Sequence, residues 1–449
     1  IYYKGKTYDY AMGYPQFIET ICRSFPHEKE NLKCYAEQLQ AVGNLISVDH
    51  LKQGTLALEG MKYFCTSAAH LIADITPDPA LRNVLAGSAL LYGGLKDVST
   101  FYQHAMINHS YIEGAYRFVD GSMQVSLELI NVIRANGGTV LNNSEATRII
   151  VENEKVQGVI INGEERLESD FVISNMHPQR TLEILDKNRS IKNAYISRIR
   201  SLENTYGIFT LYLVMKKKST PYQNRNLYLH ANNKVWYDKL LYPGRTTNCM
   251  ISMQASSEDS QYASVISILT PMYIDELSAW KDTTPEHRGG DYQSFKKEKA
   301  EQILRFIRGH GIDLSENIEE MYTTTPLSYR DYTGTVDGSA YGIIKDYKCP
   351  QIGFVSTRSR LGNLFLTGQN LNVHGALGVT LTAMLTCAEF VGQEYLAKKA
   401  KESGVDTLGN GILYKVEKEG NGPKPTATDM VKVHYKGTLP DGTVFDSSL

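Results

Sequence analysis

The sequence predicts a mixed α/β protein, and three features of its pattern lead to that class. Residues 1–120 carry apolar side chains mostly at helical spacing, and residues 121–175 place one helix ahead of short strands. Residues 205–275 contain longer runs that are typical of strands in an antiparallel sheet. A chain of 449 residues has room for two to three domains.

Helices are expected where apolar residues recur every three or four positions. The stretches that meet this rule are Asn31 to Ile46, Pro79 to Tyr92, Met123 to Asn136, residues 290–310, and about Leu377 to Lys401. Gly137 and Gly138 follow the third stretch, where a glycine cap would end a helix.

Strands are expected in short runs between turn residues. These runs are Thr139 to Leu141, Ala146 to Val151, Lys155 to Ile161, Glu168 to Ser174, Ile208 to Met215, Asn226 to His230, Cys249 to Ala255, Ser264 to Leu269, and Leu364 to Leu366. The pair Asn153-Glu154 joins the second run to the third as a hairpin. Tyr322 to Tyr341 is rich in Thr, Tyr and Gly and is expected to be a loop. Short strands and turns, including Pro440-Asp441-Gly442, follow Gly404.

Composition excludes several classes of function. The 47 basic and 49 acidic residues leave a net charge of −2, so no basic surface for nucleic acid is predicted. The six cysteines form no CxxC pair and have no histidines at ligand spacing, so neither a metal site nor a disulfide framework is expected. The sequence contains no apolar run long enough to span a bilayer and no secretory signal. We therefore expect a cytoplasmic protein, with peripheral membrane contact left open.

The strongest local pattern is an apolar strand that runs into two glycine turns and then a helix. It reads Asn363 to Asn370, followed by Gly375 to Val379. Glycines let the backbone approach a flat ligand closely, and the free N–H groups at the start of the helix favour negative charge. Read alone, this is also a common packing unit.

This segment resembles the C-terminal flavin motif of the phytoene desaturase and retinol saturase family. The resemblance implies FAD as the cofactor, bound by Gly368, Gln369, Asn370, Gly375, Ala376, Leu377 and Gly378. Gln369, Gly375 and Gly378 match the family pattern directly. Asn370 stands where the family usually has an aspartate for the ribityl chain, and a carboxamide can also hydrogen-bond a hydroxyl.

Other segments resemble the same family in the same order. They include Asp9 to Tyr14 near the family's substrate channel, residues 115–122, Asp170 to Asn175, Thr325 to Arg330, and Gly338 to Gly342. By resemblance, the strand that contains Ala146 and Thr147 passes the adenine end of FAD. The likeness covers about residues 1–396. It implies hydride transfer between the flavin and a C–C bond of an apolar, polyene-like molecule.

One family element is not found in this sequence. The G-x-G-x-x-G turn that holds the FAD pyrophosphate does not occur. The chain starts at Ile1 without a methionine and ends at Leu449 in mid-pattern, so we expect it to be cut at both ends. Impaired FAD binding is the expected consequence.

The last part of the chain resembles a different family. Gly411 to Val416, Val431 to Gly437, and Asp441 to Ser448 are similar to the start of FKBP-type peptidyl-prolyl isomerases. By this resemblance Tyr435, Phe445 and Asp446 occupy active-site positions. Because the rest of such a domain is missing, we expect no isomerase activity.

Five regions follow from these patterns. They are a mostly helical substrate or lid region at 1–120, part of an FAD-binding, Rossmann-like domain at 121–180, an antiparallel-sheet substrate domain at 181–345, a C-terminal FAD-binding segment at 346–396, and a linker helix with an incomplete isomerase domain at 397–449. The functions left open are a flavoenzyme, a prolyl isomerase and an inactive chimera. His374, His104 and His109 are interpreted as structural more readily than as acid–base groups.

Overall fold

The protein is described by a computed structural model that covers most of the chain. The described residues are 1–45, 58–231, 235–237, 244–391, 405–407, 413–416, 422, 436–438 and 444–447. Within them, helices and strands are mixed, as the sequence predicts. No helix in this described part is both long enough and apolar enough to cross a bilayer.

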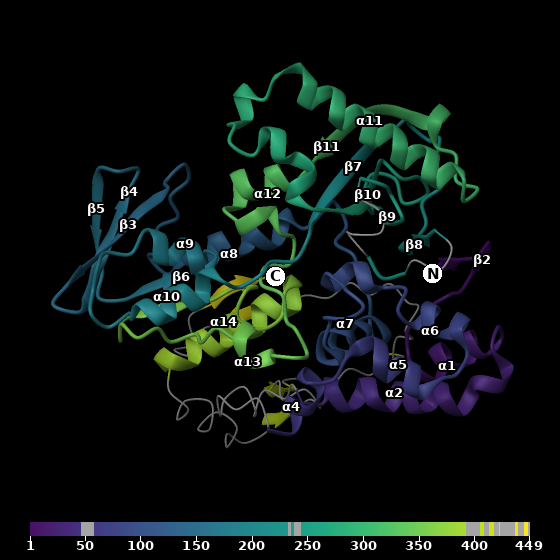
Figure 1. Cartoon of the computed structure of the whole chain (residues 1–449), viewed down its shortest axis with the longest axis horizontal. Helices are drawn as coiled ribbons and strands as arrows, with labels where there is room; N and C mark the ends of the chain where they lie inside the picture. The colour runs from purple at the N-terminus through teal and green to yellow at the C-terminus, as the bar shows by residue number, and fades with distance from the viewer. Residues whose placement is uncertain are drawn as a thin grey trace.

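The largest sheet has seven strands in the order β11-β7-β10-β9-β8-β1-β2. Their bounds are β1 (Tyr2–Tyr3), β2 (Lys6–Thr7), β7 (Gly207–Met215), β8 (Leu227–His230), β9 (Asn248–Met253), β10 (Val265–Met272) and β11 (Ile318–Thr324). Neighbours pair antiparallel, except that β1 runs parallel to β8. Helix α11 (Gly289–Arg308) packs Ile303 and Ile307 into the core of this sheet, as seen at the top of Figure 1.

Helices make up most of residues 10–113. Their bounds are α1 (Tyr14–Cys22), η1 (Pro26–Glu28), α2 (Lys29–Gly43), α4 (Leu58–Phe64), α5 (Ala68–Ile75), α6 (Pro79–Leu85), η2 (Ala89–Tyr92) and α7 (Phe101–Glu113). Side-chain caps from Ser67, Asp78 and Thr100 begin three of these helices. The expected helix from Pro79 to Tyr92 is interrupted between α6 and η2. The helices share one apolar core, built around Phe17, Tyr35 and other buried side chains, at the lower right of Figure 1.

A small sheet of β3 (Ala146–Glu152), β4 (Lys155–Ile161) and β5 (Glu165–Glu168) stands apart at the left of Figure 1. The predicted hairpin is confirmed, because Glu152 pairs with Lys155 around a two-residue loop. Asn153 and Glu154 both have positive φ, at 51° and 59°, as the favoured two-residue hairpin turns require.

The expected strand from Glu168 to Ser174 is wrong in its extent. Its residues divide between β5 and a separate strand, β6 (Val172–Ser174). The Ser169 hydroxyl donates to the carbonyl of Phe171 at 2.7 Å and makes a local turn between the two strands. The expected strand at Thr139 to Leu141 is also wrong, because these residues pair with no neighbouring strand and Leu141 is exposed.

β6 pairs in parallel with β12 (Leu364–Leu366). Around this pair lie α8 (Met123–Ala135), α9 (Pro178–Glu183), α10 (Asn193–Arg200), α13 (Pro350–Gly353) and α14 (Gly375–Val391). Strand β12 and helices α8 and α14 agree with the sequence predictions. The positive φ of Gly137 at 77° ends α8 as a glycine cap does. Residues 392–401 of the expected last helix lie outside the described residues.

The prediction of a loop over Tyr322 to Tyr341 is wrong, because this segment contains helix α12 (Pro326–Thr333). Thr325 and Ser328 form a reciprocal capping box at its start, and Pro326 occupies the first turn. Gly334, with φ of 68°, ends the helix. The remaining short helices are η3 (Ile274–Trp280), η4 (Pro285–His287), η5 (Ser315–Asn317) and η6 (Val336–Gly338).

Four short strands are described near the chain end. They are β13 (Val405–Thr407), β14 (Leu413–Lys415), β15 (Lys436–Thr438) and β16 (Val444–Ser447). β13 pairs with β14 and β15 with β16, each antiparallel. β16 passes alongside α8. The predicted turn at Pro440-Asp441-Gly442 lies outside the described residues.

The apolar stripe of α8 is exposed, although its spacing predicts a face that packs on a core. No residue of α8 is buried, and Leu129 remains 60% exposed. The predicted helix is thus confirmed, but its sequence pattern does not show whether another element covers its apolar stripe.

This exposure leads to a stability prediction for a matched pair of helical isoleucines. Ile303→Val in α11, where the side chain is fully buried, should lower the free energy of unfolding by about 1 kcal/mol. Ile133→Val in α8, where the side chain is 44% exposed, should change it by less than about 0.5 kcal/mol. Urea denaturation of both variants measures this, and equal losses would show that the α8 stripe is covered in solution.

Candidate functional site

The predicted glycine motif lies at the carboxyl ends of the two parallel strands. β6 ends at Ser174 and β12 at Leu366, and Asn175 and Gly368 follow within two residues. Ligands of open parallel sheets bind at this end of the strands. Gly368 has φ of 96°, and a Cβ there would overlap the side-chain oxygen of Asn175. Only glycine allows the two chain turns to approach this closely.

Asn370 is buried beside this turn. Its side-chain oxygen accepts from the backbone N–H of Ile343 at 3.2 Å. Gly342 faces the same carboxamide, and a Cβ there would overlap it. The oxygen of Asn370 is therefore engaged within the protein, which leaves the NH2 side of the carboxamide to meet a ligand.

The neighbouring Asn372 has an unusual environment. It is 7% exposed, and its side-chain oxygen is buried without a hydrogen-bond partner among the described residues. A buried acceptor of this kind is costly unless a donor reaches it. Gln369, three positions before, is half-buried. The sequence pattern did not single out Asn372, since nothing in its spacing separates it from Asn370.

The two later glycines have different roles. Gly375 starts α14 with φ of 76°, is exposed, and has no atom of the described residues within 4 Å of the position a Cβ would take. Ala376 and Leu377 are exposed beside it, and the N–H groups of this first turn have no partner inside the helix. Gly378 is buried, and a Cβ there would overlap the carbonyl oxygen of Val373. Gly375 therefore keeps a space open, while Gly378 allows the helix to pack.

His374 connects this segment to the helical part. Its Nε2 donates to the carbonyl of Leu91 at 2.9 Å, and its ring centroid lies 4.5 Å from that of Tyr341. Burial lowers the pKa of His374 to about 4, so the ring is neutral at neutral pH. A neutral, buried ring that bonds a carbonyl supports the structural interpretation.

The other two histidines are also held by tyrosines. His104 lies between the hydroxyls of Tyr35 and Tyr92, at 2.7 and 2.9 Å. His109 Nδ1 is 2.8 Å from the hydroxyl of Tyr14. Burial lowers the pKa of His104 to about 3. His104 is fully buried, whereas His109 is half-buried, and in both a ring nitrogen is bonded to a tyrosine, which supports the structural interpretation.

Lys345 is a buried cationic residue that the sequence pattern did not single out. It is 4% exposed, and its Nζ donates to the carbonyls of Gly353 at 2.6 Å and Asn370 at 2.9 Å. Burial, with a smaller effect of Arg198, lowers the pKa of its ammonium group to about 7. Lys345 thus ties the Asn370 turn to the end of α13.

The low pKa of Lys345 predicts how stability depends on pH. Between pH 7 and 10.5 the unfolded chain binds the proton more strongly than the folded chain, so this residue makes stability rise with pH. The rise should reach at most about 1.4 kcal/mol per pH unit. The Lys345→Met variant should lack this component, and the difference between the two denaturation series across that range isolates it. Parallel pH profiles would contradict the shifted pKa.

Ala146 and Thr147 lie on β3, in a different sheet from the glycine motif. The Thr147 hydroxyl donates to the carbonyl of Ile160 at 3.2 Å and accepts from the N–H of Gly163 at 3.1 Å. Both of its bonds stay inside the hairpin. Among the described residues, no hydrogen bond joins Ala146 or Thr147 to the segment from Gly368 to Gly378.

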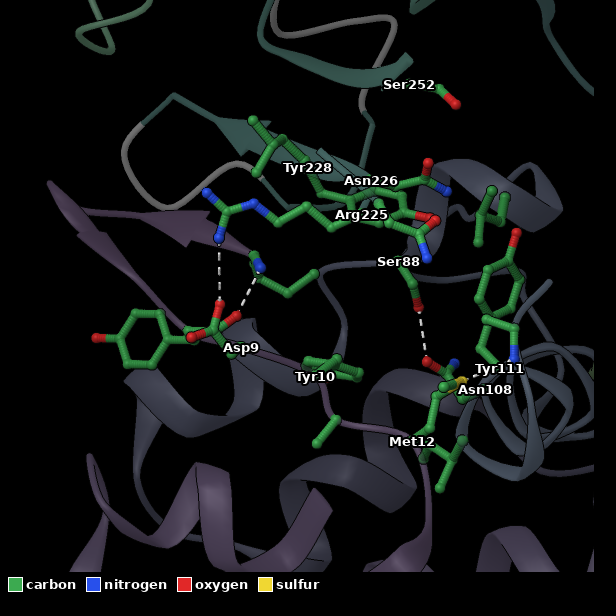
Figure 2. A pocket seen from close by; sticks show the side chains of 18 of the residues that line it. Asp9, Tyr10, Met12, Ser88, Asn108, Tyr111, Arg225, Asn226, Tyr228 and Ser252 are labelled. Atoms are coloured by element: carbon green, nitrogen blue, oxygen red, sulfur yellow. Dashed lines mark hydrogen bonds and ion pairs between the residues drawn. The ribbon is translucent and has the colours of Figure 1, made fainter. Parts of the chain in front are cut away.

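A cavity of about 470 Å³ lies between the helical part and the large sheet, within the size range of small-molecule sites. Asp9, Tyr10 and Met12 line it, from the segment that resembles the family's substrate channel. Figure 2 shows Tyr111 and Asn226 on one side and Asp9 facing Arg225 on the other. Leu91 also lines the cavity, and its carbonyl accepts the hydrogen bond from His374. The cavity wall and the glycine motif are therefore directly linked.

The isomerase-like residues are only partly described. Phe445 and Asp446 lie on β16, where Asp446 pairs with Gly437 of β15. Tyr435 lies outside the described residues. The backbone thus places two of the three predicted positions on one short hairpin.

Comparisons with known proteins separate the chain into two parts. Over 428 residues it is 22% identical to the all-trans-retinol 13,14-reductase of Danio rerio, spanning 86% of this chain and 70% of that protein. The fold is similar to that of putrescine oxidase bound to putrescine, with a TM-score of 0.55 and 13% identity, over 81% of this chain and 75% of that one. At this identity the structural match shows the fold alone.

The end of the chain matches a different group. A family model for FKBP-type peptidyl-prolyl cis-trans isomerases matches residues 422–449. Over 58 residues the chain is 62% identical to an FKBP-type isomerase of Aeromonas hydrophila, which is 13% of this chain and only 22% of that protein. Both resemblances predicted from the motifs are confirmed: most of the chain is similar to the all-trans-retinol 13,14-reductases and has an oxidoreductase fold, and its end is similar to FKBP-type isomerases.

Proposed function

We propose that residues 1–396 act as an FAD-dependent oxidoreductase on a long, apolar, unsaturated molecule. The observation that carries this proposal is the open space at Gly375, which follows the glycine turn at the carboxyl end of β12 and is joined through His374 to the cavity wall at Leu91. The retinol-reductase similarity supports the same assignment.

The residues around Gly375 fit the flavin half of FAD. The unpaired oxygen of Asn372 offers an acceptor, and the NH2 group of Asn370 offers a donor. Ala376 and Leu377 are exposed, and the N–H groups of this first helical turn favour negative charge. When bound, FAD would supply hydride exchange at its N5 atom with a C–C bond of the substrate.

The protein itself would contribute positioning and exclusion of water. Tyr341 packs on His374, and its ring centroid lies 6.3 Å from that of Tyr206. Tyr206 in turn contacts Tyr237 and Tyr273. This aromatic cluster forms an apolar wall beside the motif, which favours an apolar substrate over a charged reacting group.

FAD binding by this chain is proposed to be weak. A G-x-G-x-x-G turn, which binds the pyrophosphate in such proteins, does not occur in the sequence. Ala146 and Thr147 remain the proposed contacts for the adenine end.

A titration of the purified chain with FAD tests the assignment. Quenching of flavin fluorescence and a perturbed flavin absorption band, both saturable, are expected. Riboflavin 5′-phosphate should bind within about tenfold of FAD, since only the flavin half is expected to make strong contacts. A chain that stays colourless after addition of either flavin would contradict the proposal.

The five predicted regions are retained as the proposed domain organisation. Parallel pairing of β6 with β12 joins regions 121–180 and 346–396, and this supports treating them as one cofactor-binding unit. An apolar substrate supports the proposal of peripheral membrane contact for a cytoplasmic protein.

The isomerase-like end is a second candidate function, favoured by its family match. We propose that it lacks isomerase activity, because its described part forms two separate pairs of short strands, β13 with β14 and β15 with β16. A prolyl isomerisation assay on a short X–Pro peptide should give the uncatalysed rate. A rate that increases with protein concentration and is lost in Asp446→Ala would overturn this.

A further inference from the structure

Arg117 has an unusual charge environment in the cavity. Its Nη1 donates to the Ser252 hydroxyl at 2.7 Å and to the Met253 carbonyl at 2.8 Å, and its Nη2 donates to the Asn226 side-chain oxygen at 2.7 Å. All three acceptors are neutral. Among the described residues, no carboxylate pairs with this guanidinium, although the side chain is half-buried. Charged side chains that leave bulk water are normally paired.

The second arginine of the cavity differs in this respect. Arg225 Nη1 lies 3.9 Å from a carboxylate oxygen of Asp9, which offsets its charge. Figure 2 shows this pair on the side of the cavity opposite Tyr111. Of the two arginines in the cavity lining, Arg117 is therefore the one without a carboxylate partner among the described residues.

The three bonds fix the plane of Arg117 and leave donors unused. A guanidinium has five N–H donors, so the N–H of Nε and one N–H of Nη2 have no partner in the described part. Two adjacent guanidinium donors match the two oxygens of a carboxylate.

The surrounding side chains add further donors. Asn226 accepts from Arg117 with its oxygen, so its NH2 group is a donor for other groups. Tyr111 and Tyr228 also line the cavity, and burial raises the pKa of both hydroxyls, so both keep a proton that they can donate. Apolar side chains, including Met12, Leu91 and Ile112, line the remaining cavity. The cavity thus combines an anion-binding end with an apolar body.

We propose that this cavity binds the carboxylate end of a long-chain unsaturated acid, with Arg117 as its counter-ion. This inference rests on the proposed function and narrows it, because it selects an acid over an alcohol or a hydrocarbon as the substrate class. The relatives in the comparison are named for an alcohol, retinol. Arg117 is a specificity-determining residue in this assignment, because it binds the substrate end and not the reacting bond.

Equilibrium binding of a fluorescent C18 polyene acid, parinaric acid, tests the proposal without added flavin. The unmodified chain should bind the acid at least tenfold more tightly than its methyl ester or the matching alcohol, as expected for a charge-assisted pair. Arg117→Gln should reduce this ratio to near one and leave ester binding unchanged. Arg305→Gln, which removes an exposed charge on α11, is the matched control and should keep the ratio.

Three results would overturn the proposal. They are equal binding of acid and ester by the unmodified chain, an unchanged ratio in Arg117→Gln, or tighter binding of a long-chain alkyl phosphate than of the acid. The comparison within the unmodified chain stands even where Arg117→Gln fails to fold. Acid preference without flavin binding would remove the proposed oxidoreductase function alone, and flavin binding without acid preference would remove the substrate assignment alone.

Discussion

His104→Leu is expected to lower the free energy of unfolding by about 2 to 5 kcal/mol, because two buried tyrosine hydroxyls would lose their shared partner at about 1–3 kcal/mol each. His104 is fully buried in the helical core and bridges Tyr35 on α2 to Tyr92 on η2. Leucine can fill much of the space but can neither donate nor accept. The loss is measured by chemical denaturation followed by circular dichroism.

The control for this variant is His27→Leu. His27 is exposed on η1, and its replacement should change stability by less than about 0.5 kcal/mol. The pH profile adds a second test. The pKa of His104 is lowered from 6.5 to about 3 in the folded chain. The stability that this residue contributes is therefore fully present above pH 6.5 and is lost as the pH falls from 6.5 toward 3. His104→Leu should lose this acid-side dependence, and a variant as stable as the parent would contradict the assigned bonds.

Gly375→Asn is expected to weaken flavin binding at least tenfold while the chain stays folded. Asparagine tolerates positive φ better than other side chains, so the φ of 76° can be kept. Its side chain, however, would fill the open space at the start of α14, where we propose that the flavin lies. The affinity ratio between parent and variant comes from the same fluorescence titration that tests flavin binding.

Gly311→Asn is the matched control, because Gly311 also has positive φ, at 81°, with no atom within 4 Å of a Cβ position. It lies after α11, away from the glycine motif in sequence, and should leave flavin affinity within about twofold. Equal affinity in both variants would place the flavin elsewhere. Unfolding of Gly375→Asn alone would show that this glycine serves the fold.

Much of the fold could be predicted from local features. Periodicity located α2, α8, α11 and most strands of the large sheet, because each pattern reflects one element with one apolar face. The hairpin at Asn153-Glu154 and the glycine cap after α8 follow from backbone dihedral preferences. The missed helix α12 depends on a capping box around Pro326, a signal that is weak beside its many turn-forming residues.

The candidate site was only partly predictable. The glycines of the motif have local reasons, since Gly368 and Gly375 have positive φ and a Cβ at Gly378 would overlap Val373, although the approach of Gly368 to Asn175 depends on the fold. The sequence near Lys345, Asn372 and Arg117 gives no such local reason for their roles. Their roles depend on neighbours such as Gly353 for Lys345 and Asn226 for Arg117, which the fold and not the spacing supplies.

The sequence by itself determined most of the helices, strands and glycine turns, and which two families the chain resembles. Only the tertiary structure decided that the stripe of α8 is exposed, that His374 joins the glycine motif to the wall of a cavity, and that Arg117 lacks a charged partner there. The physical reason is the distance along the chain over which each effect acts. Periodicity and dihedral preference act between residues a few positions apart, whereas burial, charge pairing and cavity shape are set by residues separated by a hundred positions or more along the chain.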